Sequence, residues 1–310
     1  MKGIFIIAPL ILVIVLGMAL RATGFMTGHD RERLTRLLYW IVLPALLFRT
    51  TYLAGGDISG HGNMFLSAYA AMAALPLITL LISAFVTHRG DRGRQALSVM
   101  AAARSNNVYL GLPASVLALG NAGMEAASVY LAVALPGYNL ISIIWGEVVY
   151  SGGISTKAAR DIAARALKNP LVTSSLLGLA AAQLKIPVPQ TLLVSMKLVA
   201  DMATGVALVS LGMSLEISNL ASALRNAWHD ALIKLVLHPA VTWAFLLIWP
   251  VPRTFLQVAV IIASMPTAVN TFILAAGMGL DELYACEIIA VTTVFSTVTI
   301  PIWIALLGIN

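Results

Sequence analysis

Cysteine and charge are both scarce in this sequence. It contains one cysteine, Cys286, which excludes an internal disulfide framework and a zinc site built from cysteines. Because Cys286 lies in an apolar run, we expect a buried and unreactive thiol. Charged residues make up only 10% of the chain, hydrophobic residues make up 60%, and the mean hydropathy is +0.92. These values exclude a soluble globular domain and predict an all-α polytopic membrane protein.

Signatures of enzymes are also missing. The sequence has no Walker loop, no G-x-S-x-G motif, no H-E-x-x-H motif, and no His, Cys and Asp cluster at metal-ligand spacing. An ATP-driven pump is excluded for this chain alone, because it has no soluble domain to bind the nucleotide. We therefore expect a protein that is not an enzyme and that has no catalytic residues, cofactor or metal.

The first apolar run, residues 3–20, does not have the pattern of a secretory signal. A signal peptide places positive charge before its apolar region and a small-residue cleavage site after it. Here Lys2 stands alone in front, and the arginines follow the run at Arg21, Arg31, Arg33 and Arg36. The run is therefore predicted to be the first membrane span.

Ten membrane spans are predicted from the apolar runs. Most of the 19 basic residues fall in the loops after spans one, three, five and seven, as expected for cytoplasmic loops. This pattern places both termini outside the inner (plasma) membrane, and it explains the net charge of +6 without a nucleic-acid partner. The predicted spans are 4–21, 33–54, 63–87, 94–119, 124–149, 169–185, 189–215, 228–249, 254–278 and 283–308.

The longest polar connection, residues 151–169, separates two sets of five spans. Because five is odd, a duplicated second half would cross the membrane in the inverted direction, as in many secondary transporters. The sequence "ALGNAG" in span four aligns with "AAGMGL" in span nine, in agreement with such a repeat. The alternative is that any two apolar helices align to this degree.

Polar residues and helix breakers interrupt spans four and nine at matching places, "RSNNVYLGLPA" (104–114) and "SMPTAVNT" (264–271). Proline leaves backbone groups unpaired, which membrane depth tolerates only beside a cavity or protein. Each break is predicted to expose a half-helix N-terminus, and two such ends facing one another make an anion site. Alternatively, the prolines only kink their helices and the asparagines tie helices together. The candidate substrate-binding residues are Asn106, Asn107, Tyr109, Gly111, Pro113, Pro266, Asn270 and Thr271, with Tyr138 and Asn139 of span five at similar depth.

Four further ionisable residues within the spans are candidates for coupling or ion pairing. Lys197 and Asp201 are four residues apart on one helical face and can form an ion pair. The pair either stabilises span seven structurally, or it separates so that the Asp201 carboxylate can be protonated. Arg104 either attracts anions or extends its head group to the interface. His238 either titrates near neutral pH or is a packing residue. Glu287 has no assigned role.

These motifs resemble the auxin efflux carrier family, including its bacterial members. The resemblance rests on "NVYLGLP" (107–113) and the span-nine segment 263–285, with support from "IVLPALLF" (41–48), "NPLVTSSLLGLAAA" (169–182) and "ALVSLGMSLE" (207–216). It covers essentially the whole chain. Unlike the plant exporters, this chain lacks a long central cytoplasmic loop, so regulation through that loop is not implied.

The resemblance implies ten helices in two inverted five-helix repeats with crossed broken helices, a homodimer formed through scaffold helices, and elevator-type transport. The scaffold would comprise 1–58 and 169–217, the transport domain 59–150 and 218–310, and the cytoplasmic linker 151–168. It further implies a carrier that exports a small organic anion, either a malate- or malonate-like carboxylate or an auxin-like acid.

Two other functional classes stay open. A sodium- or proton-coupled symporter resembling the bile-acid transporters would share the broken helices, although spans four and nine offer amides without an obvious carboxylate. A channel or membrane receptor is the third possibility. The partners expected from the sequence are therefore a small organic anion and the lipid bilayer.

Overall fold

The computed structural model describes residues 2–54, 62–152, 167–214 and 220–309, and every regular element in these ranges is a helix. The prediction of an all-helical membrane protein is confirmed at this level. Each predicted span contains helix, but the inverted ten-span repeat stays a prediction. Within these described ranges, four helices are long and apolar enough to cross a membrane, namely Gly62–Thr87, Gln190–Met213, Ala221–Ile248 and Glu282–Leu306.

Several predicted spans consist of consecutive helical pieces. In the first half these are α1 (Lys2–Ala22), α2 (Gly28–Leu37), η1 (Leu38–Val42), α3 (Leu43–Ala54), α4 (Gly62–Ile82), η2 (Ser83–Thr87), α5 (Arg92–Ala103), η3 (Asn107–Gly111) and α6 (Leu112–Ser151). In the second half they are α8 (Pro170–Gln183), α9 (Gln190–Ser214), α10 (Leu220–Leu232), η5 (Ile233–Leu237), α11 (His238–Ile248), α12 (Arg253–Ala263), α13 (Asn270–Met278) and α14 (Glu282–Leu306).

The wide π-helical turns η1 and η5 are each followed closely by a proline, Pro44 and Pro239. A proline ring clashes with the preceding turn and provides no N–H, and a π turn is one way for a helix to absorb that disturbance. Each of these two prolines therefore accompanies a local distortion of its helix.

Helix α2 begins with a capping box. The Thr27 hydroxyl accepts a hydrogen bond from the Asp30 N–H (3.4 Å), and the Asp30 carboxylate accepts one from the Thr27 N–H (2.8 Å). The backbone hydrogen bond from Thr27 lowers the pKa of Asp30 below its usual value. The next residue, Arg31, forms an ion pair with Glu282 at 3.0 Å, which joins the start of α2 to the start of α14.

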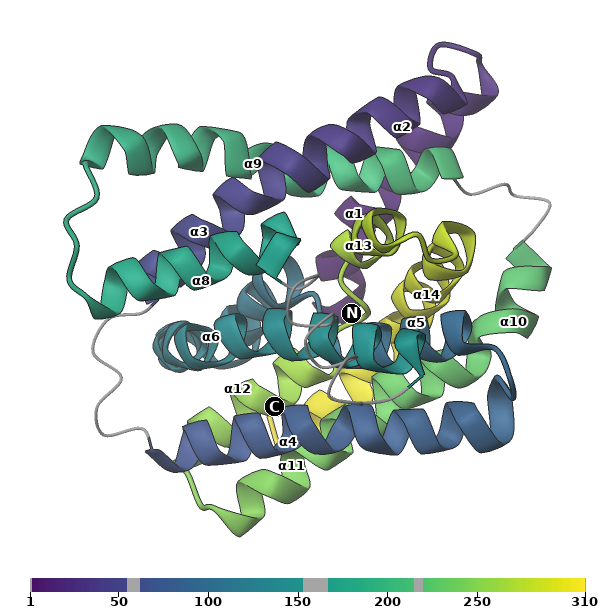
Figure 1. Cartoon of the computed structure of the whole chain (residues 1–310). Coiled ribbons are helices and arrows are strands. Elements are labelled where there is room, and N and C mark those ends of the chain that lie inside the picture. The colour runs from purple at the N-terminus through teal and green to yellow at the C-terminus, as the bar shows by residue number, and fades with distance from the viewer. Residues whose placement is uncertain (1, 55–61, 153–166, 215–219, 310) are drawn as a thin grey trace.

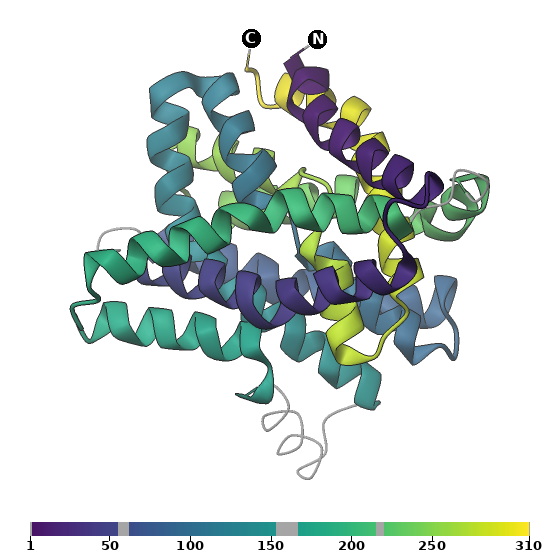
Figure 2. The same cartoon turned by 90° about the horizontal axis from the view of Figure 1, so that it is seen from above.

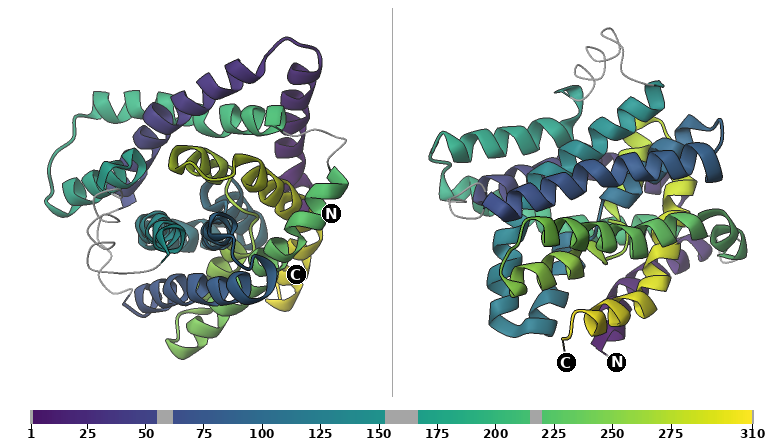
Figure 3. Two further views of the ribbon diagram at one scale, coloured as in Figure 1. Left: turned by 45° about the vertical axis from the view of Figure 1, so that its right-hand side comes forward. Right: turned by 90° about the horizontal axis from the view of Figure 1, so that it is seen from below.

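Helices α3, α8 and α9 form one layer, and α4 with α11 lies on the opposite side of the molecule (Figure 1). Helices α5, α6, α12 and α13 lie between them, as two further views show (Figure 3). Every residue from Gln95 to Ala103 and from Gln257 to Ala263 is buried. A pair of breaks in the middle layer is therefore surrounded by protein.

Glycines allow the helices of the outer layer to pack closely. A Cβ atom at Gly212 of α9 would lie 2.1 Å from the Ile14 carbonyl oxygen of α1, and one at Gly17 would lie 2.3 Å from the Val209 oxygen. Likewise, a Cβ at Gly178 of α8 would lie 2.4 Å from the Phe48 oxygen of α3. Such direct backbone contact is typical of tightly associated helices in membranes.

Spans four and nine are both interrupted, as predicted. Helix α5 ends at Ala103 and α12 ends at Ala263, and the extended segments that follow cross antiparallel. The Asn106 N–H donates to the Pro266 oxygen (2.9 Å), and the Ala268 N–H donates to the Arg104 oxygen (2.8 Å). These two bonds satisfy backbone groups that the breaks release from their helices.

Both half-helices end at a glycine with positive φ, Gly120 (φ 63°) inside α6 and Gly279 (φ 69°) after α13. Only glycine adopts such a conformation without strain. The predicted repeat alignment pairs Gly120 with Gly277, so its register at the turn is off by two residues. The start of α1 and the end of α14 lie on the same side of the molecule (Figure 2), as the predicted placement of both termini requires. Their orientation across the membrane stays a prediction.

Candidate functional site

Two helix starts meet at the crossing of the interrupted spans. Helix η3 begins at Asn107 after Asn106, and α13 begins at Asn270 after Val269. Among the described residues, no side chain caps either start. The Asn107 N–H donates to the Ser105 oxygen (2.8 Å) and the Thr271 N–H to the Ala268 oxygen (2.9 Å). Because the start of a helix carries partial positive charge, both starts still favour an anion nearby.

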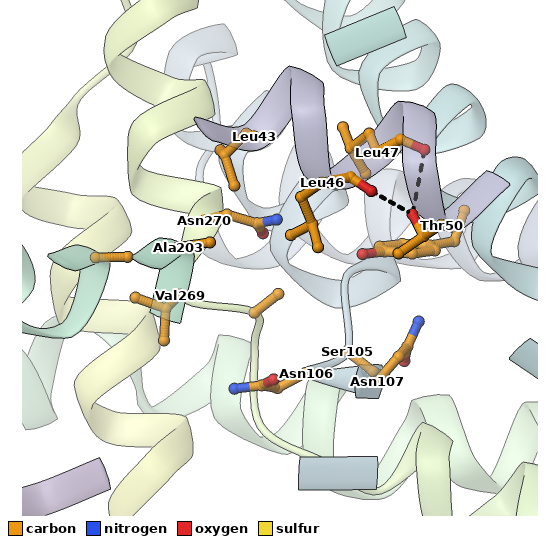
Figure 4. A pocket seen from close by; sticks show the side chains of 13 residues that line it. Leu43, Leu46, Leu47, Thr50, Ser105, Asn106, Asn107, Ala203, Val269 and Asn270 are labelled. Carbon is orange, nitrogen blue, oxygen red and sulfur yellow. Dashed lines mark hydrogen bonds between the residues drawn. The ribbon is translucent and has the colours of Figure 1, made fainter. Parts of the chain in front are cut away.

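A cavity lies between this crossing and the layer of α3 and α9 (Figure 4). Its empty space is about 580 Å³, including the part open to solvent. The Thr50 hydroxyl on its wall donates to the carbonyl oxygens of its own helix at Leu46 and Leu47. The residues lining the cavity are Leu43, Leu46, Leu47, Thr50, Ser105, Asn106, Asn107, Tyr138, Ala203, Ala207, Ala268, Val269 and Asn270.

Arg104 lies directly behind the cavity and is fully buried. Its Nη2 donates to Asn270 Oδ1 (3.1 Å), its Nη1 donates to Ser142 Oγ (3.0 Å), and its guanidinium lies 5.3 Å from the centre of the Tyr138 ring. Since arginine only donates, the Asn270 amide must turn its oxygen toward Arg104. This leaves the Asn270 NH₂ group as a donor for the cavity. The alternative that Arg104 extends to the membrane interface is wrong.

A second buried cation, Lys234 of η5, lies beside the other half of the crossing. Its Nζ contacts Ser105 Oγ (2.5 Å), the Ala263 carbonyl oxygen (3.1 Å) and His238 Nδ1 (2.6 Å). The sequence interpretation missed Lys234. It also treated His238 as a lone histidine, whereas the structure pairs it with Lys234.

His238 lines a further cavity on the far side of the crossing, with about 340 Å³ of empty space including the part open to solvent. This cavity and the first one share Ser105, Asn107 and Tyr138 in their walls. The crossing therefore separates two spaces, of which one borders α3 and α9 and the other borders α4 and α11.

The charge around the crossing is positive. The backbone N–H of Arg104 donates to the Met100 and Ala101 carbonyl oxygens at the C-terminal end of α5, and the Lys234 ammonium bonds the Ala263 carbonyl at the C-terminal end of α12. Lys234 therefore stabilises the partial negative end of α12, while the positive starts of η3 and α13 face the first cavity. In the part of the chain that the structure describes, neither cation forms a salt bridge. A buried charge without a counter-ion is unfavourable, so a bound anion would stabilise this arrangement.

Of the predicted substrate-binding residues, Asn106, Asn107, Tyr138 and Asn270 line the first cavity. Pro266 lies in the break and offers its carbonyl oxygen to Asn106. The side chain of Tyr109 lies outside what the structure describes.

The other predicted residues do not line this cavity. Gly111 packs against Ile262, 3.0 Å from the position of a Cβ atom. Pro113 is exposed in the first turn of α6, and the helical backbone already begins at Asn107, so Pro113 does not mark the break. Thr271 and Asn139 are buried and do not line the cavity, although each directly follows a wall residue in the sequence, Asn270 and Tyr138 respectively.

Lys197 and Asp201 form the predicted ion pair at 2.5 Å on α9. More than half of each side chain is exposed, and neither lines a cavity at the crossing. Glu287 accepts hydrogen bonds from Asn226 at 3.2 Å, which gives it a structural partner.

The opposite wall of the first cavity was missed by sequence reasoning. The residues of α3 on this wall are spaced as one helical face, and Ala203 and Ala207 of α9 are four residues apart. The signal was an apolar stripe with small residues, which is common to most membrane helices and does not by itself indicate a binding site.

Comparisons with known proteins find relatives among membrane transport proteins. Residues 154–304 match the family model described as "Membrane transport protein". The chain is 24% identical over 300 residues to an "Uncharacterized transporter" of Methanothermobacter thermautotrophicus, covering 96% of both chains. It is 26% identical over 287 residues to a "Putative malonate transporter" of Rhizobium meliloti, covering 90% of this chain and 88% of the relative. The family resemblance predicted from the sequence motifs is therefore confirmed: residues 154–304 match the membrane transport protein family, to which the auxin efflux carriers belong.

Proposed function

We propose that this protein is a secondary carrier that exports a small organic anion. One observation carries the proposal: the starts of η3 and α13 meet at a cavity, and directly behind it lies the buried cation Arg104, which forms no salt bridge among the described residues. Donors at this site are the Asn270 NH₂ group and the helix starts, and they suit a carboxylate. The name of the Rhizobium meliloti relative supports malonate as the first substrate to test.

The position of the cavity supports an elevator mechanism. One wall comes from α3 and α9, which the resemblance assigns to the scaffold, and the other comes from the crossing, which it assigns to the transport domain. A solute held at this boundary would move with the crossing past the leucines of α3. The close glycine contacts of α1 with α9 and of α3 with α8 favour a rigid scaffold. An inverted repeat that pairs α1 with α8 and α3 with α9 would relate these two contacts to each other.

Membrane potential is a sufficient driving force for export. Moving one negative charge outward across an inside-negative membrane gains about 2.3 kcal/mol per 100 mV. This direction fits the proposed location in the inner membrane with both termini outside. A homodimer through the scaffold helices is part of the same proposal and leaves the crossing free to move.

A proton-coupled carrier is the second candidate, supported by the contact between Lys234 and His238. Because their nitrogens are 2.6 Å apart, simultaneous protonation of both is strongly disfavoured. The pair also bonds Ser105, which lines both cavities. Sodium coupling has less support, because the cations Arg104 and Lys234 would repel a sodium ion at the crossing.

Counterflow in proteoliposomes tests these alternatives. Labelled malonate is supplied outside, and the unlabelled interior solute is malonate, malate, an indole acetic acid or the neutral analogue malonamide. We expect the carboxylates, but not malonamide, to drive uptake, with varied potential, pH and sodium separating the coupling modes. Equal exchange by malonamide would refute an anion site. A flux that does not saturate with malonate concentration would instead indicate a channel.

A further inference from the structure

A second buried polar cluster lies away from both cavities, where η2, α10 and α14 meet. It consists of His88 at the end of η2, His229 and Asp230 of α10, and Tyr284 in the first turn of α14. The His88 and Asp230 side chains are 4% and 2% exposed, whereas His229 is 14% exposed. These residues play no part in the proposed solute site.

The side-chain atoms of this cluster converge on one point. His88 Nε2 lies 3.0 Å from His229 Nε2, and Asp230 Oδ2 lies 3.8 Å from the first and 3.4 Å from the second. The Tyr284 hydroxyl donates to the same carboxylate oxygen and lies 2.8 Å from His88 Nε2. The two imidazoles therefore present the same nitrogen to each other and to one carboxylate.

Hydrogen bonding alone accounts poorly for this arrangement. When two neutral imidazoles face each other through Nε2, one Nε2 donates its proton and the other accepts it. Neither Nε2 then has a proton left to donate to the Asp230 carboxylate. Asp230 Oδ1 is buried and has no hydrogen-bond partner among the residues that the structure describes. A buried carboxylate oxygen without a donor is unfavourable, and a cation in the cluster would relieve it.

We propose that His88, His229 and Asp230 bind a transition-metal ion of the zinc type. Zinc binds histidine nitrogen and carboxylate oxygen at about 2.0–2.2 Å, so tetrahedral geometry places ligand atoms roughly 3.3–3.5 Å apart. The three distances of 3.0, 3.4 and 3.8 Å bracket that spacing. Two imidazoles disfavour magnesium and calcium, which prefer oxygen ligands.

Tyr284 takes the role of an orienting residue. Its hydroxyl holds Asp230 Oδ2, and hydrogen bonds of this kind fix the direction of metal ligands. Arg94 covers the Tyr284 ring, with its guanidinium carbon 4.6 Å from the ring centre. The partial exposure of His229 provides an entry route, and the fourth coordination position stays open for water.

The site would join three segments that are distant in the chain. His88 precedes α5, and the other ligands lie on the helix that continues through η5 to Lys234. A bound metal would therefore fix the base of α5 relative to α10 and α14. It would stabilise the elements that support the crossing without contacting the solute.

Cobalt titration of the intact protein tests the metal site directly. The full chain is purified with an affinity tag that contains no histidines, treated with a chelator, and titrated with Co²⁺. We expect visible absorption typical of low-coordinate Co²⁺ that saturates at one equivalent per chain and disappears when Zn²⁺ is added. Zn²⁺ should also raise the thermal unfolding midpoint in a concentration-dependent manner.

His88→Gln and Asp230→Asn should each abolish the absorption and the thermal shift. His29→Gln is the matched control, because the His29 side chain is 68% exposed on α2 and should leave both signals unchanged. The wild-type titration decides the matter even when a ligand variant fails to fold. Wild-type protein that shows no saturable Co²⁺ absorption, or that shows it equally in the His88 and Asp230 variants, would overturn the proposal.

Discussion

Replacing Asn270 with aspartate should separate the stability of the crossing from its affinity for anions. In the wild type the Asn270 oxygen accepts from Arg104, and its NH₂ group is left for the cavity. Asn270→Asp preserves the acceptor and adds a negative charge beside a buried cation that has no carboxylate partner among the described residues. The variant should therefore unfold at the same temperature as the wild type or higher.

Anion binding should be lost in the same variant. The cavity loses one charge-assisted donor, worth about 1.5–3 kcal/mol, which corresponds to roughly 10- to 150-fold in Kd. A bound carboxylate about 5 Å from the new charge would also be repelled by about 3 kcal/mol at an effective dielectric constant of about 20, a further factor of about 200. Asn270→Ala should lose only the first of these contributions and should also be less stable, because Arg104 loses an acceptor.

The assay is thermal unfolding with and without malonate, followed by counterflow. Malonate should raise the wild-type midpoint by mass action on the folded state and should leave the Asn270→Asp midpoint unchanged. Asn121→Ala is the control, because Asn121 is exposed on α6 and lines neither cavity at the crossing. Malonate protection of Asn270→Asp equal to that of the wild type would show that the anion site lies elsewhere.

Three further predictions follow from the packing, the second cation and the charge pattern. Gly212→Val should lower the unfolding midpoint, since overpacking typically costs about 1–3 kcal/mol. Gly205→Ala is the control and should leave the midpoint unchanged, because outside its own helical backbone no described atom lies within 4 Å of the new Cβ. Equal midpoints for the two variants would refute the close contact between α1 and α9. Lys234→Met should lower malonate counterflow at least tenfold and leave protein in the membrane, and unchanged flux would exclude Lys234 from the transport cycle. A reporter active only outside the cytoplasm should work at the C-terminus and fail near Lys157, and the reverse result would refute the predicted topology.

Much of this fold was predictable because membrane depth restricts the residues that a chain can place there. Apolar runs located the helices, and the two breaks were found because polar residues and proline are unfavourable in lipid. The asparagines at the breaks could be named for the same reason. Pro113 was misleading, because a proline is tolerated in the first turn of a helix and there marks no interruption. The break lies at residues 104–106, where the antiparallel crossing, rather than a proline, replaces the lost helical bonds.

Lys234 was overlooked although its sequence signal was present. A lysine in the apolar run of span eight is unfavourable unless it has a partner, and His238 follows it at the spacing of one helical turn. Its other partners, Ser105 and the Ala263 carbonyl, come from two different spans, and no local pattern connects them. The cluster of His88, His229 and Asp230 was invisible for the same reason. Sequence spacing reveals metal ligands only when they share a local segment.

Each of the two breaks creates unpaired backbone groups of opposite partial charge, and these two kinds of group have different partners in the structure. Breaking a helix releases carbonyl oxygens at the end of one half and N–H groups at the start of the next. At the carbonyl ends, the Lys234 ammonium donates to Ala263 O of α12, and the Arg104 backbone N–H and the Thr267 hydroxyl donate to carbonyl oxygens at the end of α5. Among the described residues, no side chain caps the starts of η3 and α13, which face a cavity whose wall includes the amides of Asn106, Asn107 and Asn270. A cation would be repelled by both lysine and arginine, whereas an anion would satisfy the helix starts and balance the buried charge. The proposed preference for an anion thus follows from which half of each break is left uncapped among the described residues.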